Sequence, residues 1–212
     1  MQMARSIPRL YVVTDRQQTA GRPLEEVVAA AAQGGAGMIQ LREKDFTARE
    51  LYDLGRRLQD RLKPYGIPLL INDRLDVAQA LDAAGVHLAG HSLAPSLARR
   101  VLGPDKLIGV STHSLDHARQ AMREGADFIV FGPVFDTPSK RQYGAPQGLQ
   151  RLTDIVANIT CPVIAIGGIN TDNLPQVLQT GAHGVAMIRA VLAASDPGEA
   201  AWQLAQQLNT IS

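Results

Sequence analysis

Short apolar segments alternate with longer amphipathic segments along this chain of 212 residues. The apolar segments have the length and β-branched content of buried strands, and the amphipathic segments repeat their apolar positions at helical spacing. Regular alternation of this kind indicates repeated strand–helix units on a parallel sheet. We predict eight strands, at Leu10–Asp15, Met38–Arg42, Leu69–Asn72, Val86–Leu88, Leu107–Ser111, Phe128–Gly132, Val163–Gly167 and Gly184–Ile188.

A helix is predicted after each strand. The expected helices are Leu24–Gln33, Ala48–Leu62, Leu75–Leu81, a short one near Pro95–Leu102, Leu115–Arg123, Leu149–Ala157, Asp172–Gln179 and Gly198–Leu208. Gly125 and Gly181 stand where helices should end before the next strand. Eight units in about 200 residues is the compact limit of a closed barrel, whereas open doubly wound sheets usually contain fewer units. We therefore predict an α/β fold, a single (β/α)8 TIM-barrel domain over residues 1–212.

Composition narrows the classes of function. The chain is 45% hydrophobic and 19% charged, as expected of one globular domain with a large core. Its formal net charge of +1 gives no support for a nucleic-acid or membrane surface, although a compact anionic ligand remains compatible with it. Cys161 is the only cysteine, which excludes an internal disulfide and fits a reducing compartment. The N-terminal residues lack a signal peptide's apolar stretch, so the expected location is the cytoplasm.

The second predicted strand carries the clearest chemical signal. Its two-residue period places Gln40, Arg42 and Lys44 on one side and Ile39 and Leu41 on the other. The apolar side should face the helices, so the polar side should face the end of the barrel where active sites form. Two cations and an amide are costly to desolvate there without an anionic partner, and a phosphate-rich ligand would be one.

Simpler roles remain open for these residues and for the third strand. Arg42 and Lys44 could belong to a structural ion-pair network with Glu43, Asp73 or another carboxylate. Asn72 and Asp73 end the third strand, where Asp73 could bind Mg²⁺ or the pair could cap the helix that follows.

Other candidates lie at later strand ends. Glycines after the seventh strand would let backbone N–H groups approach a phosphate, although tight turns also use glycine. The long 132–148 connection offers Thr137, Ser139 and Lys140 as phosphate donors, or it is an ordinary solvated loop.

The histidines and the tryptophan carry less information. His87, His91 and His113 have no readable catalytic partner, so we expect packing or surface roles for them. His183 precedes the eighth strand and should lie on the opposite, stability face. Trp202 is expected to pack in the core.

Taken in order, several motifs resemble the thiamine phosphate synthase family, which includes the TenI-like proteins. They are QLREK, INDR, GVHL, GVSTHS, GADFIVFGPVFDTPSK, PVIAIGGI and GAHGVAMI, and they cover essentially the whole chain. The resemblance implies a TIM-barrel transferase of thiamine biosynthesis that couples hydroxymethylpyrimidine diphosphate to thiazole phosphate and releases diphosphate. A homo-oligomer is compatible with the resemblance.

The resemblance also implies roles for individual residues. The pyrimidine diphosphate would be held by Gln40, Arg42, Lys44, Asn72, Ser111 and Lys140, with Arg42, Lys44 and Lys140 stabilising the departing diphosphate. Asp73 would bind the Mg²⁺ cofactor. The thiazole substrate would meet Thr137 and Ser139, and its phosphate would meet Gly168 with the backbone of Ile188 and Arg189.

One departure from the family pattern leaves the activity open. Synthases usually carry HLGQ-x-D, whereas this chain reads His87-Leu-Ala-Gly-His-Ser92, so Ser92 replaces a second metal-binding aspartate. The TenI-like thiazole tautomerases also lack that aspartate, which keeps a tautomerase as the alternative. Retention of Gln40, Lys44 and the Asn72–Asp73 pair favours the synthase. A barrel that binds a thiamine precursor without turnover is the non-enzymatic alternative.

Overall fold

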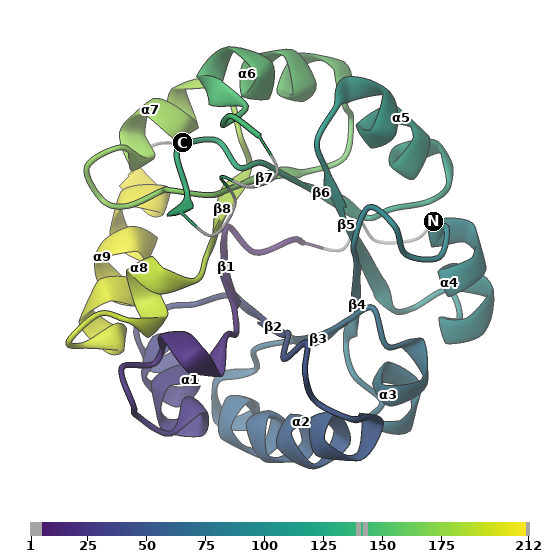
Figure 1. The fold of residues 1–212 in the computed structure, drawn as a ribbon, viewed down its shortest axis with the longest axis vertical. Helices are drawn as coiled ribbons and strands as arrows, with labels where there is room; N and C mark the ends of the chain where they lie inside the picture. The colour runs from purple at the N-terminus through teal and green to yellow at the C-terminus, as the bar shows by residue number, and fades with distance from the viewer. Residues whose placement is uncertain (1–5, 139–140, 142–143, 211–212) are drawn as a thin grey trace.

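Eight parallel strands form a closed barrel in the computed structural model, which describes residues 6–138, 141 and 144–210 (Figure 1). Each strand pairs with its neighbours in chain order, and β1 pairs with β8 to close the ring. The strands are β1 Leu10–Val13, β2 Met38–Leu41, β3 Leu69–Asn72, β4 Gly85–Leu88, β5 Leu107–Thr112, β6 Phe128–Phe131, β7 Val163–Ile166 and β8 Gly184–Met187. The predicted (β/α)8 barrel is confirmed.

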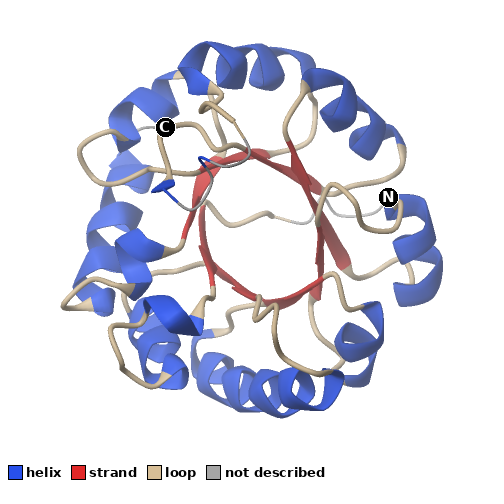
Figure 2. Cartoon of the chain, viewed as in Figure 1, coloured by secondary structure: helices blue, strands red, loops and turns tan. Residues whose placement is uncertain are grey.

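Helices surround the barrel as an outer ring (Figure 2). They are α1 Leu24–Gln33, α2 Ala48–Leu62, α3 Leu75–Ala80, α4 Pro95–Leu102, α5 Leu115–Arg123, α6 Gly148–Asn158, α7 Leu174–Gln179, α8 Arg189–Leu192 and α9 Pro197–Thr210, with 3-10 turns η1 Arg16–Gln18 and η2 Lys63–Tyr65. The sequence prediction missed α8, a single turn between β8 and α9. None of the helices in the described ranges is long and apolar enough to cross a membrane.

The inside of the barrel is filled with side chains. Tyr11, Met38, Leu70, Phe128 and Ile164 belong to one buried cluster contributed by alternate strand positions. A Cβ at residue 109 would lie 2.2 Å from the Phe128 ring, so the glycine there makes room for the phenyl group. The apolar layer therefore supports the polar residues that end the strands above it.

A second buried cluster lies between the strands and the helices. It includes Ile39 and Leu41 of β2, which pack with Leu51, Leu54 and Leu58 of α2. The spacing of these leucines places them on one face of α2, and Thr47 begins the helix with a capping box. The predicted division of β2 into a helix-facing apolar side and an inward polar side is thus confirmed for its described strand residues.

The N-terminal end of the barrel is closed by the segment that precedes β1. Ile7 is buried in the interior cluster, and its carbonyl oxygen lies 2.6 Å from Nε2 of His183. His183 therefore lies at the end of the barrel opposite the strand C-termini, as predicted.

Trp202 does not pack in the core as expected, because 51% of its surface is exposed on α9. The apolar positions that α9 buries are Ala201, Leu204 and Leu208, and this stripe leaves residue 202 on the outer face.

Candidate functional site

We call the C-terminal end of the barrel the mouth. At this end of the barrel, polar side chains lie next to the apolar cluster that fills the barrel interior. Gln40 of β2 is only 2% exposed, and its Nε2 donates to the hydroxyl of Tyr11 at 2.8 Å. His87 of β4 is 3% exposed, and its Nε2 lies 2.8 Å from Oγ of Ser111 on β5. Gln40 and Ser111 were predicted to share this end, and the structure brings both to the Tyr11–His87 pair, whose ring centroids are 5.8 Å apart.

His87 was expected to serve packing, and the structure gives it a more specific environment. Its Nδ1 is buried and has no hydrogen-bond partner among the described residues. Burial lowers the pKa of His87 to about 4, with Asp73 raising it and Arg42 lowering it to smaller extents. A neutral imidazole with one unpaired nitrogen therefore lies in the barrel interior, next to Ser111 and to the Tyr11 ring that Gln40 contacts. A signal in the sequence that could have revealed this environment is the alternation of β4, in which His87 pairs with Asn72 of β3.

We expect the protein to lose stability as the pH falls from about 6.5 to about 4. In this range the unfolded chain protonates residue 87 while the folded state resists it, because the folded pKa lies below the usual value of 6.5. The loss should reach on the order of 3 kcal/mol at pH 4. Urea unfolding of His87→Gln, compared with wild type across this range, measures it. If the free energy of unfolding of the variant fell as steeply with pH as that of the wild type, groups other than His87 would cause the acid sensitivity.

Arg42 and Lys44 follow β2 at the rim of the mouth. Arg42 is half-buried and Lys44 is exposed. Within the described ranges, neither side chain makes a hydrogen bond or an ion pair, so the network suggested with Glu43, Asp73 or another carboxylate is not formed there. Glu43 pairs instead with Arg16, at 3.3 Å. The two predicted cations are thus left available to an external anion.

Asp73 occupies a strained position at the end of β3. Its φ is +56°, a left-handed conformation that is uncommon for a residue with a side chain and is often found at functional sites. One carboxylate oxygen accepts from the backbone N–H of Ala89 at 3.0 Å and from the hydroxyl of Ser92. The other accepts from Nδ2 of Asn72 at 3.1 Å. The alternative of a helix cap is wrong, because the N-cap residue of α3 is Arg74 and no side-chain hydrogen bond caps the helix.

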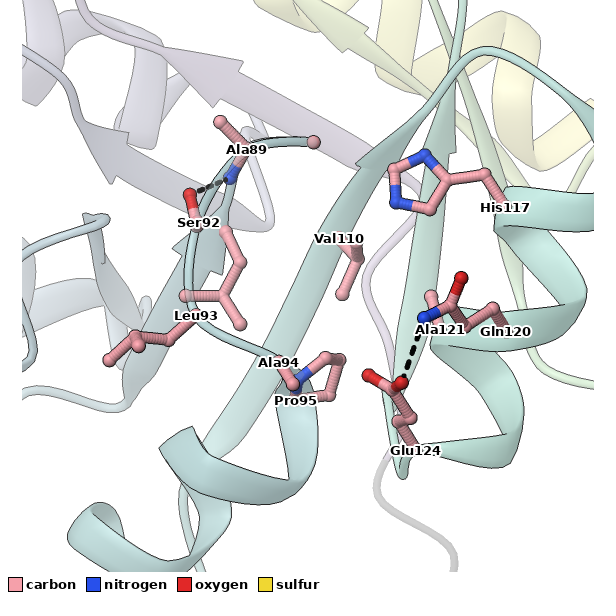
Figure 3. A pocket seen from close by; sticks show the side chains of 12 residues that line it. Ala89, Ser92, Leu93, Ala94, Pro95, Val110, His117, Gln120, Ala121 and Glu124 are labelled. Carbon is pink, nitrogen blue, oxygen red and sulfur yellow. Dashed lines mark hydrogen bonds between the residues drawn. The ribbon is translucent and has the colours of Figure 1, made fainter.

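Ser92 therefore lies at the mouth, in direct contact with the carboxylate whose partner aspartate it replaces. A cavity of about 320 Å³ lies between the β4–α4 loop and α5 (Figure 3). Ala89 and Ser92 line it together with Val110, with His117 and Gln120 of α5, and with Glu124, the residue that follows α5.

The glycine pair after β7 is required by close packing. A Cβ at Gly168 would lie 2.7 Å from the carbonyl oxygen of Asp136, and one at Gly167 would lie 2.5 Å from Pro133. Both glycines also have positive φ angles, of +66° and +100° respectively. The β6–α6 loop thus lies directly on the pair and brings Thr137 to this side of the mouth. Ser139 and Lys140 fall outside the described residues.

The short helix α8 begins beside the same edge. Ile188 is its N-terminal cap residue and packs against the interior cluster, while Arg189 is exposed. The guanidinium of Arg22 donates to the carbonyl oxygens of Leu192 and Ala194 at 2.9 and 2.7 Å, which fixes the C-terminal end of α8.

The mouth combines unpaired cations, a carboxylate and neutral hydrogen-bonding groups. Arg42 and Lys44 can bind an anion, and Asp73, Asn72 and Ser92 offer the hard oxygen ligands that Mg²⁺ prefers. Because Mg²⁺ commonly uses one or two carboxylates together with substrate phosphates, this donor set fits the ion. No cluster of three or more His, Cys, Asp or Glu side chains suited to a metal occurs in the described part of the chain.

Comparison with known proteins agrees with this chemistry. Residues 10–191 match the family model described as thiamine monophosphate synthase. The thiamine-phosphate synthase of Syntrophomonas wolfei is 46% identical over 93% of this chain and 95% of its own length. That of Roseiflexus sp. (strain RS-1) is 45% identical over 89% of this chain and 80% of its own length. A solved thiamine phosphate pyrophosphorylase from Pyrococcus furiosus is 38% identical, with a TM-score of 0.88 and 96% of each chain covered.

Proposed function

Because this chain belongs to the thiamine monophosphate synthase family and is a thiamine-phosphate synthase, a transferase of thiamine biosynthesis, we propose that its barrel mouth performs the coupling. The substrates are hydroxymethylpyrimidine diphosphate and thiazole phosphate. The observation that supports this assignment is the pair of cations, Arg42 and Lys44, that follow the C-terminal end of β2 and have no ion-pair partner in the described ranges. An anion with several charges, such as a diphosphate, supplies what these side chains lack.

The chemistry needs no protein nucleophile. The bond between the pyrimidine methylene carbon and the diphosphate oxygen breaks, and its electron pair leaves with the diphosphate. The lone pair of the thiazole nitrogen then forms the new C–N bond, and that nitrogen keeps the positive charge. The aminopyrimidine ring stabilises the methylene cation between these events, so positioning and electrostatics are what the protein must supply.

The residues of the mouth divide this work. Arg42, Lys44 and Lys140 bind the diphosphate and stabilise the charge that develops as it leaves. Gln40, Asn72 and Ser111 orient the pyrimidine from the barrel interior. His87 stays neutral near pH 7, so it adds no positive charge beneath the developing methylene cation.

The second substrate occupies the opposite side of the mouth. Thr137 and Ser139 contact the thiazole, and the backbone at Gly168, Ile188 and Arg189 receives its phosphate. The β6–α6 loop and the glycine pair are held together by the close packing described above, which supports a shared site for the two segments.

Asp73 would hold Mg²⁺, with Asn72 and Ser92 close enough to contribute oxygen donors or water contacts. The ion supplies charge neutralisation to the leaving diphosphate when it is bound.

The function is tested with purified protein and both substrates. We expect thiamine phosphate and diphosphate to form in equal amounts, and only when Mg²⁺ is present. The control incubates the same protein with a thiazole carboxylate phosphate alone, the substrate of the tautomerases. Isomerisation of that compound without diphosphate release from the substrate pair would refute the proposal.

A further inference from the structure

The hydroxyl of Thr14 replaces a main-chain acceptor where β1 and β2 separate. The backbone N–H of Thr14 donates to the carbonyl of Gln40 at 2.9 Å, which continues the parallel ladder by one bond. In a continuing ladder the next bond would run from the N–H of Arg42 to the carbonyl of Thr14. The N–H of Arg42 donates instead to Oγ1 of Thr14, at 2.9 Å. A side chain therefore fixes the backbone from which the Arg42 guanidinium projects.

Thr14 is in turn held by a buried carboxylate. Its hydroxyl donates to Oε1 of Glu43 at 2.8 Å, and the side chains of both residues are almost fully buried. The oxygens of Glu43 also accept from the backbone N–H of Arg16, at 3.2 and 3.1 Å, and from its guanidinium at 3.3 Å. All of these donors belong to the β1–α1 loop. The carboxylate of Glu43, the residue after Arg42, therefore joins that loop to the β2–α2 loop.

Arg16 completes the arrangement at the surface. Its guanidinium makes two bonds to Asp45, at 2.6 and 2.5 Å, and lies 4.4 Å from the centroid of the Phe46 ring. These contacts occupy Arg16, so it neutralises Glu43 without competing for a ligand in the mouth. Arg42, by contrast, has its backbone fixed and its guanidinium unpaired within the described ranges.

A buried carboxylate is a costly way to join two loops. Apolar residues of similar volume would serve packing as well or better, because desolvation offsets much of the gain from a buried ion pair. The polar arrangement has a property that apolar packing lacks: it gives the N–H of Arg42 a directed acceptor at a defined angle.

We propose that Thr14 and Glu43 are positioning residues that aim Arg42 at the diphosphate of the pyrimidine substrate. This inference rests on the proposed function of the mouth. It assigns to Glu43, inside the QLREK motif, a role distinct from those of its neighbours Arg42 and Lys44, since its carboxylate contacts Thr14 and Arg16 and acts on Arg42 through Thr14.

The test measures binding of inorganic diphosphate with Mg²⁺ by calorimetry. Thr14→Val removes the hydroxyl at nearly constant volume and should weaken diphosphate binding about tenfold, as a misaimed charge-assisted contact would. Thr14→Ser keeps the hydroxyl and should bind as the wild type does. In turnover, the KM for the pyrimidine diphosphate should rise in Thr14→Val while the KM for thiazole phosphate stays unchanged.

A double-mutant cycle separates positioning from a general structural role. In an Arg42→Ala background, Thr14→Val should have little further effect on diphosphate binding, because the residue through which it acts is gone. Additive losses, or equal losses for both substrates, would overturn the inference. The same double-mutant cycle can be made with Glu43→Gln and Arg42→Ala. Glu43→Gln replaces Thr14→Val in the test if Thr14→Val fails to fold.

Different results would overturn the proposed function and the positioning role of Thr14 and Glu43. The proposed function alone would be overturned if the wild-type protein bound diphosphate but formed no thiamine phosphate, while the effects of Thr14→Val and Arg42→Ala on diphosphate binding were non-additive as expected. A wild-type protein that binds no diphosphate in the presence of Mg²⁺ would overturn the positioning role as well.

Discussion

Arg42→Ala should lower kcat/KM for coupling by about 100- to 1000-fold, equivalent to roughly 2.7–4 kcal/mol of lost transition-state stabilisation. The reason is geometric: Arg42 is a half-buried cation at the mouth, its backbone is fixed by Thr14, and its guanidinium has no protein partner in the described ranges. Its positive charge is therefore available to the leaving diphosphate. Steady-state kinetics with both substrates at saturating Mg²⁺ measures the loss.

The same variant should keep its fold. Since the guanidinium makes no hydrogen bond or ion pair within the described residues, its removal leaves no buried partner unsatisfied, and the melting temperature should change by a few degrees at most. Arg49→Ala is the matched control, because Arg49 is an exposed arginine in α2. It should leave both kinetics and melting unchanged. Near-wild-type turnover in Arg42→Ala would remove Arg42 from the site.

The barrel could be predicted because each strand carries its own signal. Segments such as Val163–Ile166 are short, apolar and bounded by turn residues, and Ala48–Leu62 repeats leucines at helical spacing after a capping box. The single turn of α8 has neither signal: Arg189–Leu192 is too short to show a period and has no side-chain cap. Its contacts come from far away in the sequence: Arg22 donates to the carbonyl oxygen of Leu192, the last residue of α8, and to that of Ala194 beyond it.

The site was predictable in outline for a similar reason. Alternation along β2 placed Gln40 inside the barrel, which needs only the two-residue period of a strand, and Arg42 follows the last residue of that strand. The role of Glu43 could not be read in this way, because β2 ends at Leu41 and alternation no longer applies beyond it. His87 was given a packing role because its contacts, Ser111 and Tyr11, come from other strands. Local pattern therefore identifies which residues reach the mouth, while pairing across strands decides what each contacts.

Ser92 shows how such a contact changes the interpretation of a sequence. Replacement of an aspartate by serine suggests a lost metal ligand, yet the hydroxyl of Ser92 donates to the carboxylate of Asp73 and accepts from the N–H of Ala89 at 2.8 Å. The serine thus keeps its place beside Asp73 but contributes no charge. A site with one carboxylate should bind Mg²⁺ weakly until diphosphate supplies further oxygens.

Ser92→Asp should therefore raise the affinity of the free protein for Mg²⁺ on the order of tenfold, since it adds a second carboxylate next to Asp73. Calorimetry without substrate should show weak binding by the wild type and tighter binding by the variant. In the coupling assay, the variant should reach half-maximal rate at a lower Mg²⁺ concentration, while the KM for thiazole phosphate stays the same.

Without metal, the same change should destabilise the fold. Two carboxylates would then lie where a hydroxyl now donates to Asp73, and the repulsion would add to the strain of the left-handed residue 73. Mg²⁺ should consequently raise the melting temperature of Ser92→Asp more than that of the wild type. Ser92→Asn is the control, because it matches the size of aspartate and lacks its charge. If the asparagine variant gained as much Mg²⁺ affinity as the aspartate variant, or if the aspartate variant gained none, residue 92 would not contribute to a metal site.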